Sequence, residues 1–216
     1  MTTVITMPNS LKFASFDLRL TRPKMFASTE VRIGERAELE EPFWTFSGST
    51  PPLTRSDYDN CVSFLEQADG GGSVVEVYNV FYQRPRAYGQ SPLSGIKASG
   101  GAFNGTGSIQ SISSRYLVSV SGLPAGFQIS NSCLIEFRSS TDTLVRSLHR
   151  VSAAATASAQ GVADVSLTHP LPQIVTSSFL PIFERASCLM RITDYSKADS
   201  FLDQSISLSG EEVMFS

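Results

Sequence analysis

The chain has 216 residues and a formal net charge of −3, with 41% hydrophobic and 17% charged residues. A chain of this length can bury one sizeable core or two small ones. Its weak negative charge, with no basic cluster among aromatic residues, argues against a nucleic-acid-binding surface. The low share of charged residues suits a protein packed against copies or partners, although an ordinary serine-rich β-protein has the same composition.

The first fifty residues predict two half-buried strands, because apolar and polar residues alternate along them. The first strand covers Phe16–Thr21 and is ended by Pro23, and the second covers Thr29–Ile33 and is ended by Gly34. An acidic loop is expected over Glu35–Glu41. Three large aromatic residues and a turn rich in Gly, Ser and Pro follow this loop.

Residues 54 to 68 carry the one well-formed helix signal of the sequence. Thr54 is a suitable N-cap, and the carboxylate of Asp57 favours the positive end of a helix. Apolar residues then recur at spacings of three and four on one face, at Tyr58, Cys61, Val62, Leu65 and Ala68. Gly70–Gly72 are expected to end this helix before a strand over Val74–Tyr82.

Residues 85 to 107 are rich in Pro and Gly and predict a boundary between two domains. Residues 1–90 are expected to form an antiparallel sheet or split barrel with one helix, and residues 91–216 a β-sandwich or barrel. The fold class is therefore mainly β with one α-helix. Strands in the second half are expected at residues 108–113, 116–120, 127–137, 144–155, 162–167, 188–192 and 206–215. Alanine content alone would allow a helix at residues 151–159, but β-branched and serine residues favour a strand there.

The three cysteines, Cys61, Cys133 and Cys188, have neither disulfide-framework nor zinc-site spacing. We expect them to be buried apolar residues in a reducing compartment. The first ten residues lack a signal-peptide pattern, and no apolar stretch approaches transmembrane length. The chain is therefore expected to fold in a cytosol, without insertion into a membrane.

Residues that could carry catalysis are sparse. The two histidines, His149 and His169, have no partner at a catalytic or metal-ligand spacing, and no nucleophile-elbow motif is present. Asp164 could complete a Ser/His/Asp triad only through folding, and Asp194 and Asp199 are isolated acids. No enzyme activity, metal or cofactor is expected.

The order of parts resembles the distal tail and minor tail proteins of tailed bacteriophages, which form rings where the tail tube meets its tip. The resemblance covers nearly the whole chain as sparse positions. In the first half these are Phe43-Trp44, the Thr54–Ala68 helix with Gly70-Gly71-Gly72, and Tyr82–Tyr88. In the second half they are Leu123–Phe127, Leu148–Val151, Gly161–Val165 with Pro170 and Pro172, and Cys188–Ile192.

The resemblance implies a structural virion protein without cofactor or catalytic residues. In that family an N-terminal sheet-and-helix domain forms a belt, usually in a hexameric ring, and a β-sandwich projects outwards. The implied partners are identical subunits, the tail tube protein and the tail-tip hub proteins, with DNA only passing through the lumen. The implied location is the virion tail, assembled in the host cytoplasm.

Two groups of residues are candidates for this role. One short strand cannot turn three large aromatic side chains to the same side, because alternate side chains face opposite ways. We therefore predict that Phe43, Trp44 and Phe46 lie partly at a subunit contact. The alternative is that both faces of the strand are covered within the monomer. The acids Glu35, Glu38, Glu40 and Glu41 are predicted to face a lumen and repel passing DNA, and the alternative is a solvated hairpin tip.

A carbohydrate- or receptor-binding module of the tail tip is the alternative function. It would place a host-surface glycan on the C-terminal β-domain. The sequence offers few aromatic residues beside amides or acids for this purpose, namely Phe103-Asn104, Tyr116 and Tyr195 near Asp194. Aromatic residues of β-domains are more often core residues.

Overall fold

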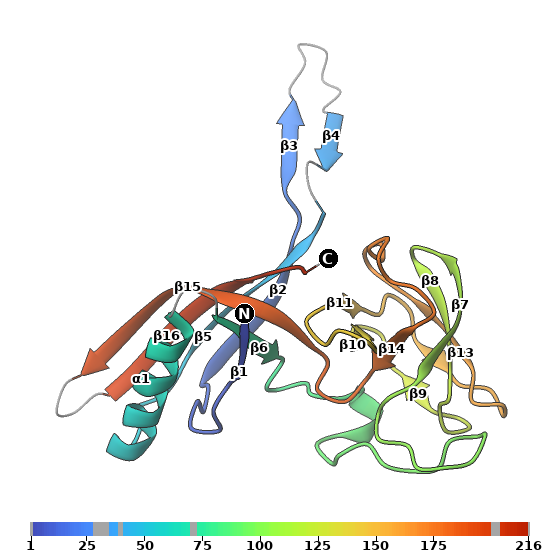
Figure 1. The fold of residues 1–216 in the computed structure, drawn as a ribbon, viewed down its shortest axis with the longest axis horizontal. Helices are drawn as coiled ribbons and strands as arrows, with labels where there is room; N and C mark the ends of the chain where they lie inside the picture. The colour runs from blue at the N-terminus through green and yellow to red at the C-terminus, as the bar shows by residue number, and fades with distance from the viewer. Residues whose placement is uncertain (1, 28–34, 39–40, 70–72, 200–203, 216) are drawn as a thin grey trace. The chain divides into compact units, whose positions relative to one another are not determined.

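The computed structural model describes residues 2–27, 35–38, 41–69, 73–199 and 204–215, and it is mainly β with one α-helix, as predicted (Figure 1). The chain divides into two compact units. The first unit joins Met1–Val75 to Met190–Glu212, and the second joins Glu76–Leu189 to Val213–Ser216. The predicted contiguous domains 1–90 and 91–216 are therefore wrong, because the last strands return to the first unit.

A six-stranded sheet has the strand order β1-β6-β15-β16-β5-β2. The last strand of the chain, β16, lies between β15 and β5 and pairs antiparallel with both. Strand β5 pairs antiparallel with β2 on its other side. The bounds are β1 Thr3–Thr6, β2 Ser15–Thr21, β5 Phe43–Ser49, β6 Ser73–Tyr78, β15 Ser187–Asp199 and β16 Gln204–Glu212.

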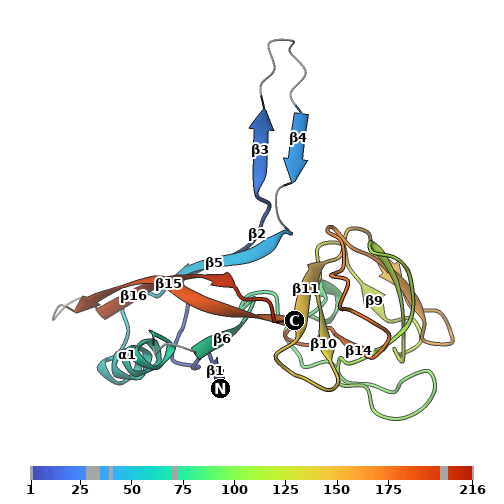
Figure 2. The same ribbon diagram turned by 45° about the horizontal axis from the view of Figure 1, so that its top comes forward.

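One face of this sheet is apolar because alternate side chains of its strands point the same way. Leu18, Trp44 and Phe46 are buried on β2 and β5, and Ile206 and Leu208 are buried on β16. The helix α1, Arg55–Asp69, lies along one face of the sheet (Figure 2). Its own buried residues are Tyr58, Cys61, Phe64, Leu65 and Ala68.

The start of α1 follows the predicted capping pattern. The Asp57 N–H donates to Thr54 Oγ1 at 3.2 Å, and the Tyr58 N–H donates to the Thr54 carbonyl at 2.9 Å. Within the helix, Phe64 is buried and Val62 is only half-buried. Phe64 therefore takes the place of Val62 in the predicted apolar face. The predicted glycine exit, Gly70–Gly72, lies outside the described residues.

The second unit is built around one apolar core. Two three-stranded sheets, β11-β10-β14 and β13-β8-β7, and the pair β12-β9 contribute to this core. The bounds are β7 Ser108–Ser114, β8 Leu117–Ser121, β9 Gln128–Ile129, β10 Leu134–Ser139, β11 Arg146–Arg150, β12 Ala155–Thr156, β13 Ala163–Ser166 and β14 Phe179–Ile182. At the centre the Phe127 ring contacts the rings of Tyr88, Phe103 and Phe183, with centroids 4.9, 5.2 and 5.4 Å away. Side chains from both three-stranded sheets meet in this core.

Several predicted strand bounds are wrong. The expected strand 127–137 is two strands, separated by a turn in which Ser132 has a φ of 67°. Within the expected strand 151–159 only Ala155–Thr156 is assigned as strand. Strand β14 was not predicted. It contains Pro181, which lacks an N–H, and it lies at a sheet edge, where proline is tolerated.

Replacing Thr54 with Ala should lower the free energy of unfolding by about 1 kcal/mol, because the Asp57 N–H loses its acceptor. Chemical denaturation followed by circular dichroism measures this change. Thr54→Ser is the matched control, because it keeps the hydroxyl and should stay close to wild type. Equal stability of the Ala and Ser variants would contradict the capping role.

Candidate functional site

Strands β3, Lys24–Ala27, and β4, Glu35–Glu38, form a separate two-stranded sheet. They pair antiparallel from Lys24↔Glu38 to Ala27↔Glu35. Figures 1 and 2 show the pair extending from the ends of β2 and β5, beyond the larger sheet. In the described part of the chain neither strand pairs with a third strand. A lone two-stranded ladder is marginally stable in water and presents two open edges to other chains.

Prolines separate this ladder from the main sheet. The β2–β5 ladder ends at Thr21↔Phe43, and the next pair is Lys24↔Glu38. Pro23 lies in the gap on one side and Pro42 on the other. Because proline has no N–H to donate, pairing is interrupted there and the outer ladder becomes a distinct element.

The predicted aromatic contact is corrected by the structure. Trp44 is 1% exposed and Phe46 is 2% exposed, so both are core residues of the chain itself. Phe43 alternates with Trp44 along β5 and is half-buried. This is the alternative that the sequence left open for Trp44 and Phe46. Of the three residues, Phe43 alone keeps side-chain surface for a subunit contact.

The predicted acidic loop is partly a strand. Glu35 and Glu38 are the first and last residues of β4, and Glu41 is exposed between β4 and β5. Glu40 lies outside the described residues. The loop prediction is wrong for residues 35–38, since these residues pair with β3, with Lys24 opposite Glu38. That the glutamates face a lumen stays a prediction.

A polar groove of about 700 Å³ runs between α1 and the segment that follows β1. Its helix side includes Asn60 and Gln67, and its other side includes Asn9. Lys12 and Asp57 form an ion pair across it at 3.1 Å. The hydrogen bond from Lys12 and that from Thr54 lower the pKa of the Asp57 carboxyl. Amides and hydroxyls of this kind can bind a polar ligand, but their arrangement specifies no reaction.

The sheet face away from the buried side chains is rich in hydroxyls. A shallow hollow of about 320 Å³ there is lined mainly by serines of β2, β5, β15 and β16, with Asp194 among them. The Ser15 and Ser49 hydroxyls are 2.7 Å apart, and those of Thr21 and Thr45 are 3.1 Å apart. These short neutral side chains share the face with the charged residues Asp17, Arg19 and Asp194, which lie in register with them.

The two histidines meet inside the second unit. Their rings stack with centroids 4.1 Å apart, and His149 Nε2 lies 2.8 Å from Ser147 Oγ. Ser147, His149 and His169 are all buried, and His149 Nδ1 has no hydrogen-bond partner in the described residues. Asp164 is exposed on β13. Among the described residues no acid accepts from His149 Nδ1, and the Ser147 hydroxyl is buried, so Ser147 and His149 lack the arrangement of a hydrolase triad.

Buried charges are paired elsewhere in the second unit. Arg146 Nη1 lies 2.6 Å from Glu76 Oε1, and Arg138 lies between Glu76 and the fully buried Glu136. The Ser187 hydroxyl donates to Glu76 at 2.8 Å. Burial opposes ionisation of Glu76, but the Ser187 hydrogen bond and the two arginines outweigh it and lower the pKa of this carboxyl. The network joins β6, β10, β11 and β15. Its carboxylates and guanidiniums pair with one another, so we interpret its role as structural.

Of the predicted sugar-binding aromatics, Phe103 and Tyr116 belong to the second unit and Tyr195 to the first. Phe103 is 3% exposed and belongs to the core, which corrects that prediction. Tyr116 is 52% exposed beside β8, whereas Tyr195 is half-buried on β15. Sequence reasoning missed the exposed pair Phe81 and Tyr82, because they continue a strand-like apolar run.

No protein-family model matches this chain, and no curated protein matches it at a significant level. Within the described ranges, no helix is long and apolar enough to cross a membrane. The same residues contain no group of three or more His, Cys, Asp or Glu arranged to hold a metal ion.

Replacing Trp44 with Ala should lower the free energy of unfolding by about 3–5 kcal/mol, because a large buried side chain leaves a cavity. Phe43→Ser should cost about 1 kcal/mol, since Phe43 is only half-buried. Denaturant titration measures both changes. If Trp44→Ala were no more destabilising than Phe43→Ser, the core assignment of Trp44 would be wrong.

The stability of the protein should depend on pH, because buried His149 resists protonation in the folded chain. Burial, with repulsion from His169 and partly opposed by a backbone group of His169, lowers the pKa of His149 well below its usual value. As pH falls below about 6.5, the unfolded chain therefore binds a proton that the folded chain does not. The free energy of unfolding should fall by up to about 1.4 kcal/mol per pH unit from this residue.

The comparison must be made between wild type and His149→Gln, because Glu212 acts in the opposite direction. Burial raises the pKa of Glu212 to about 7, although the Trp44 N–H donates to this carboxyl. The contribution of Glu212 to the free energy of unfolding is therefore lost as pH rises towards 7. Denaturation of both proteins from pH 5 to 8 should show a shallower acid loss in His149→Gln. Parallel curves would mean that His149 is not held neutral.

Proposed function

We propose that this protein is a structural subunit of a bacteriophage tail tip that assembles into a closed homomeric ring. The observation that carries the proposal is the separate β3–β4 ladder, attached to a sheet that α1 covers on one face. The resemblance to distal tail proteins points in the same direction. In this proposal the ring joins the tail tube to the tip proteins, and DNA passes through its lumen.

The physical argument starts from unsatisfied strand edges. A two-stranded ladder gains stability when a neighbouring chain pairs with its edge. If β3 of one subunit pairs with β4 of an identical neighbour, the contact is head-to-tail, and such a contact either closes into a ring or grows into a filament. A tail tip requires closure. The number of six subunits comes from the resemblance alone.

A glycan-binding module remains the second candidate, and it has weaker support. Its expected aromatic residue Phe103 is buried and Tyr195 is half-buried, so Tyr116 is the one exposed residue of these three. The polar groove beside α1 belongs to the first unit and lacks an exposed aromatic wall, since Phe64 at that groove is buried.

Replacing residues 24–38 with a short Gly/Ser turn should abolish ring formation while leaving the first unit folded. The β2–β5 ladder closes at Thr21↔Phe43, so the sheet does not depend on the deleted pairs. Electron microscopy of assembled particles and subunit stoichiometry inside them measure the outcome. A matched control replaces the exposed Ala153 and Ala154 of the second unit with Gly and Ser and should assemble normally.

Six copies in a closed ring of the intact particle are expected. A single copy at the tip would overturn the proposal, and so would an enzyme activity mapped to His149 or His169. Because an isolated subunit can stay monomeric until a tail template is present, the particle is the sample that decides.

A further inference from the structure

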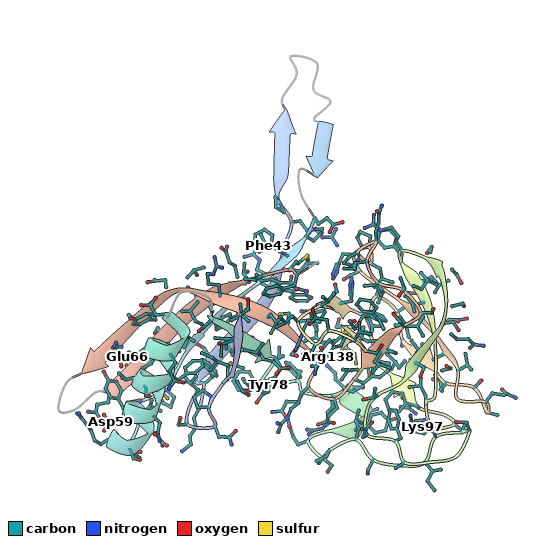
Figure 3. The ribbon with its side chains drawn as sticks, in the orientation of Figure 1. Phe43, Asp59, Glu66, Tyr78, Lys97 and Arg138 are labelled. Atoms are coloured by element: carbon teal, nitrogen blue, oxygen red, sulfur yellow. The ribbon has the colours of Figure 1, made fainter. Side chains whose placement is uncertain are left out.

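An exposed patch of aromatic and arginine side chains lies on the second unit. We define this aromatic–arginine patch as Tyr78, Phe81, Tyr82, Arg86 and Arg185. Tyr82 is 59% exposed and Phe81 is 43% exposed, which is unusual for neighbouring large aromatic residues. Tyr78, at the end of β6, is labelled in Figure 3. Large exposed apolar side chains at one place mark interaction surfaces more often than ordinary surface.

The turn that carries the aromatic residues is held by hydrogen bonds. Asn79 Oδ1 accepts from the N–H groups of both Phe81 and Tyr82, each at 3.0 Å. This closes an Asx-type turn directly before the two rings. Beneath it, buried Arg84 pairs with Glu184 and donates to the Gln90 carbonyl at 2.8 Å. The patch is therefore preorganised, which lowers the entropy cost of binding.

Arg185, the other arginine of the patch beside Arg86, has an unfavourable backbone conformation. Arg185 has a φ of 50°, in the left-handed region that non-glycine residues seldom adopt. Its N–H donates to the Gln83 carbonyl at 2.8 Å, and its Nε donates to Gln83 Oε1 at 3.2 Å. Such conformations persist where the surroundings impose them, and they cluster at functional sites.

The chemistry of the patch selects an anion. The guanidinium of Arg86 lies 5.4 Å from the centre of the Tyr82 ring, and that of Arg185 lies 5.5 Å from the centre of the Tyr78 ring. Stacked guanidiniums keep N–H groups for carboxylates, and arginine donates hydrogen bonds but cannot accept them. A ligand must therefore bring acceptor oxygens together with apolar surface for Phe81.

We propose that this patch docks the glutamate-rich segment around β4 of a second copy of the chain. This inference deepens the proposed ring and rests on it. The segment 35–41 carries four glutamates against one arginine, which complements the two guanidiniums. Tyrosine and arginine are also the residue types that dominate binding energy at protein interfaces. Sugar hydroxyls need acceptors as well as donors, and the patch arginines supply donors only.

This docking gives Glu35, Glu38 and Glu41 a role at an interface instead of a lumen. The two roles are separable, because docking requires the arginines of the patch and repulsion of DNA does not. Loss of contact in patch variants therefore reports on docking alone.

The test titrates a fluorescein-labelled peptide of residues 35–42 into the full-length protein. The receiving chain carries Glu35→Gln, Glu38→Gln and Glu41→Gln, so that its patch is not occupied by another copy. Fluorescence polarisation should show binding that weakens at least about tenfold with Arg86→Glu plus Arg185→Glu. Lys97→Glu is the matched control; it reverses a charge in the same unit away from Tyr78 and should leave binding unchanged (Figure 3).

A labelled peptide with all glutamates replaced by glutamine should not bind. Absence of binding by the native peptide, equal binding of both peptides, or an unchanged affinity in the Arg86→Glu, Arg185→Glu variant would overturn the inference. Binding of polygalacturonate in place of the peptide would overturn it in favour of an acidic glycan. A ring in the particle without peptide binding refutes only this docking, whereas a single copy in the particle refutes the proposed ring.

Discussion

The first unit depends on the insertion of β16 between β15 and β5. This strand supplies Ile206 and Leu208 to the buried face of the sheet, and it pairs with strands on both sides. It also fixes the start of α1, because the Thr50 N–H donates to the Ile206 carbonyl at 2.9 Å and the Leu53 N–H donates to the Gln204 carbonyl at 2.9 Å. Without β16, β5 and β2 would be separated from the rest of the sheet, and α1 would lose a surface on which to pack.

The second unit combines an apolar core with a partly buried ion-pair network. Glu136 is fully buried, so its charge requires Arg138 and the Ser187 N–H, which donates to it at 3.0 Å. A buried ion pair gains little over an apolar core of the same shape, but removal of one partner is costly. The network therefore restricts which arrangement of β6, β10, β11 and β15 is acceptable, in addition to the stability that the apolar core provides.

The two surfaces proposed for assembly differ in the interactions that they offer a partner. The β3–β4 ladder offers main-chain hydrogen bonds along open edges, which provide affinity with little choice of partner. The aromatic–arginine patch offers charge and ring surfaces on a fixed turn, which select a partner by its chemistry. A head-to-tail ring benefits from both kinds of contact, because edge pairing alone also permits filaments and aggregates.

The sequence by itself determined the elements whose signals are local. The α1 cap at Thr54, the alternation along β2 and the mainly β fold class all follow from neighbouring residues, and the structure confirms them. Tertiary structure alone decided which faces were covered. Trp44 and Phe46 could have served a subunit contact until the buried face of the sheet enclosed them, and Phe103 became core by contact with Phe127. The return of β15 and β16 to the first unit, and the pairing of Arg185 with Gln83 across a hundred residues, are long-range contacts. Local patterns carry no information about them, because periodicity describes which side chains share a face and not what that face meets.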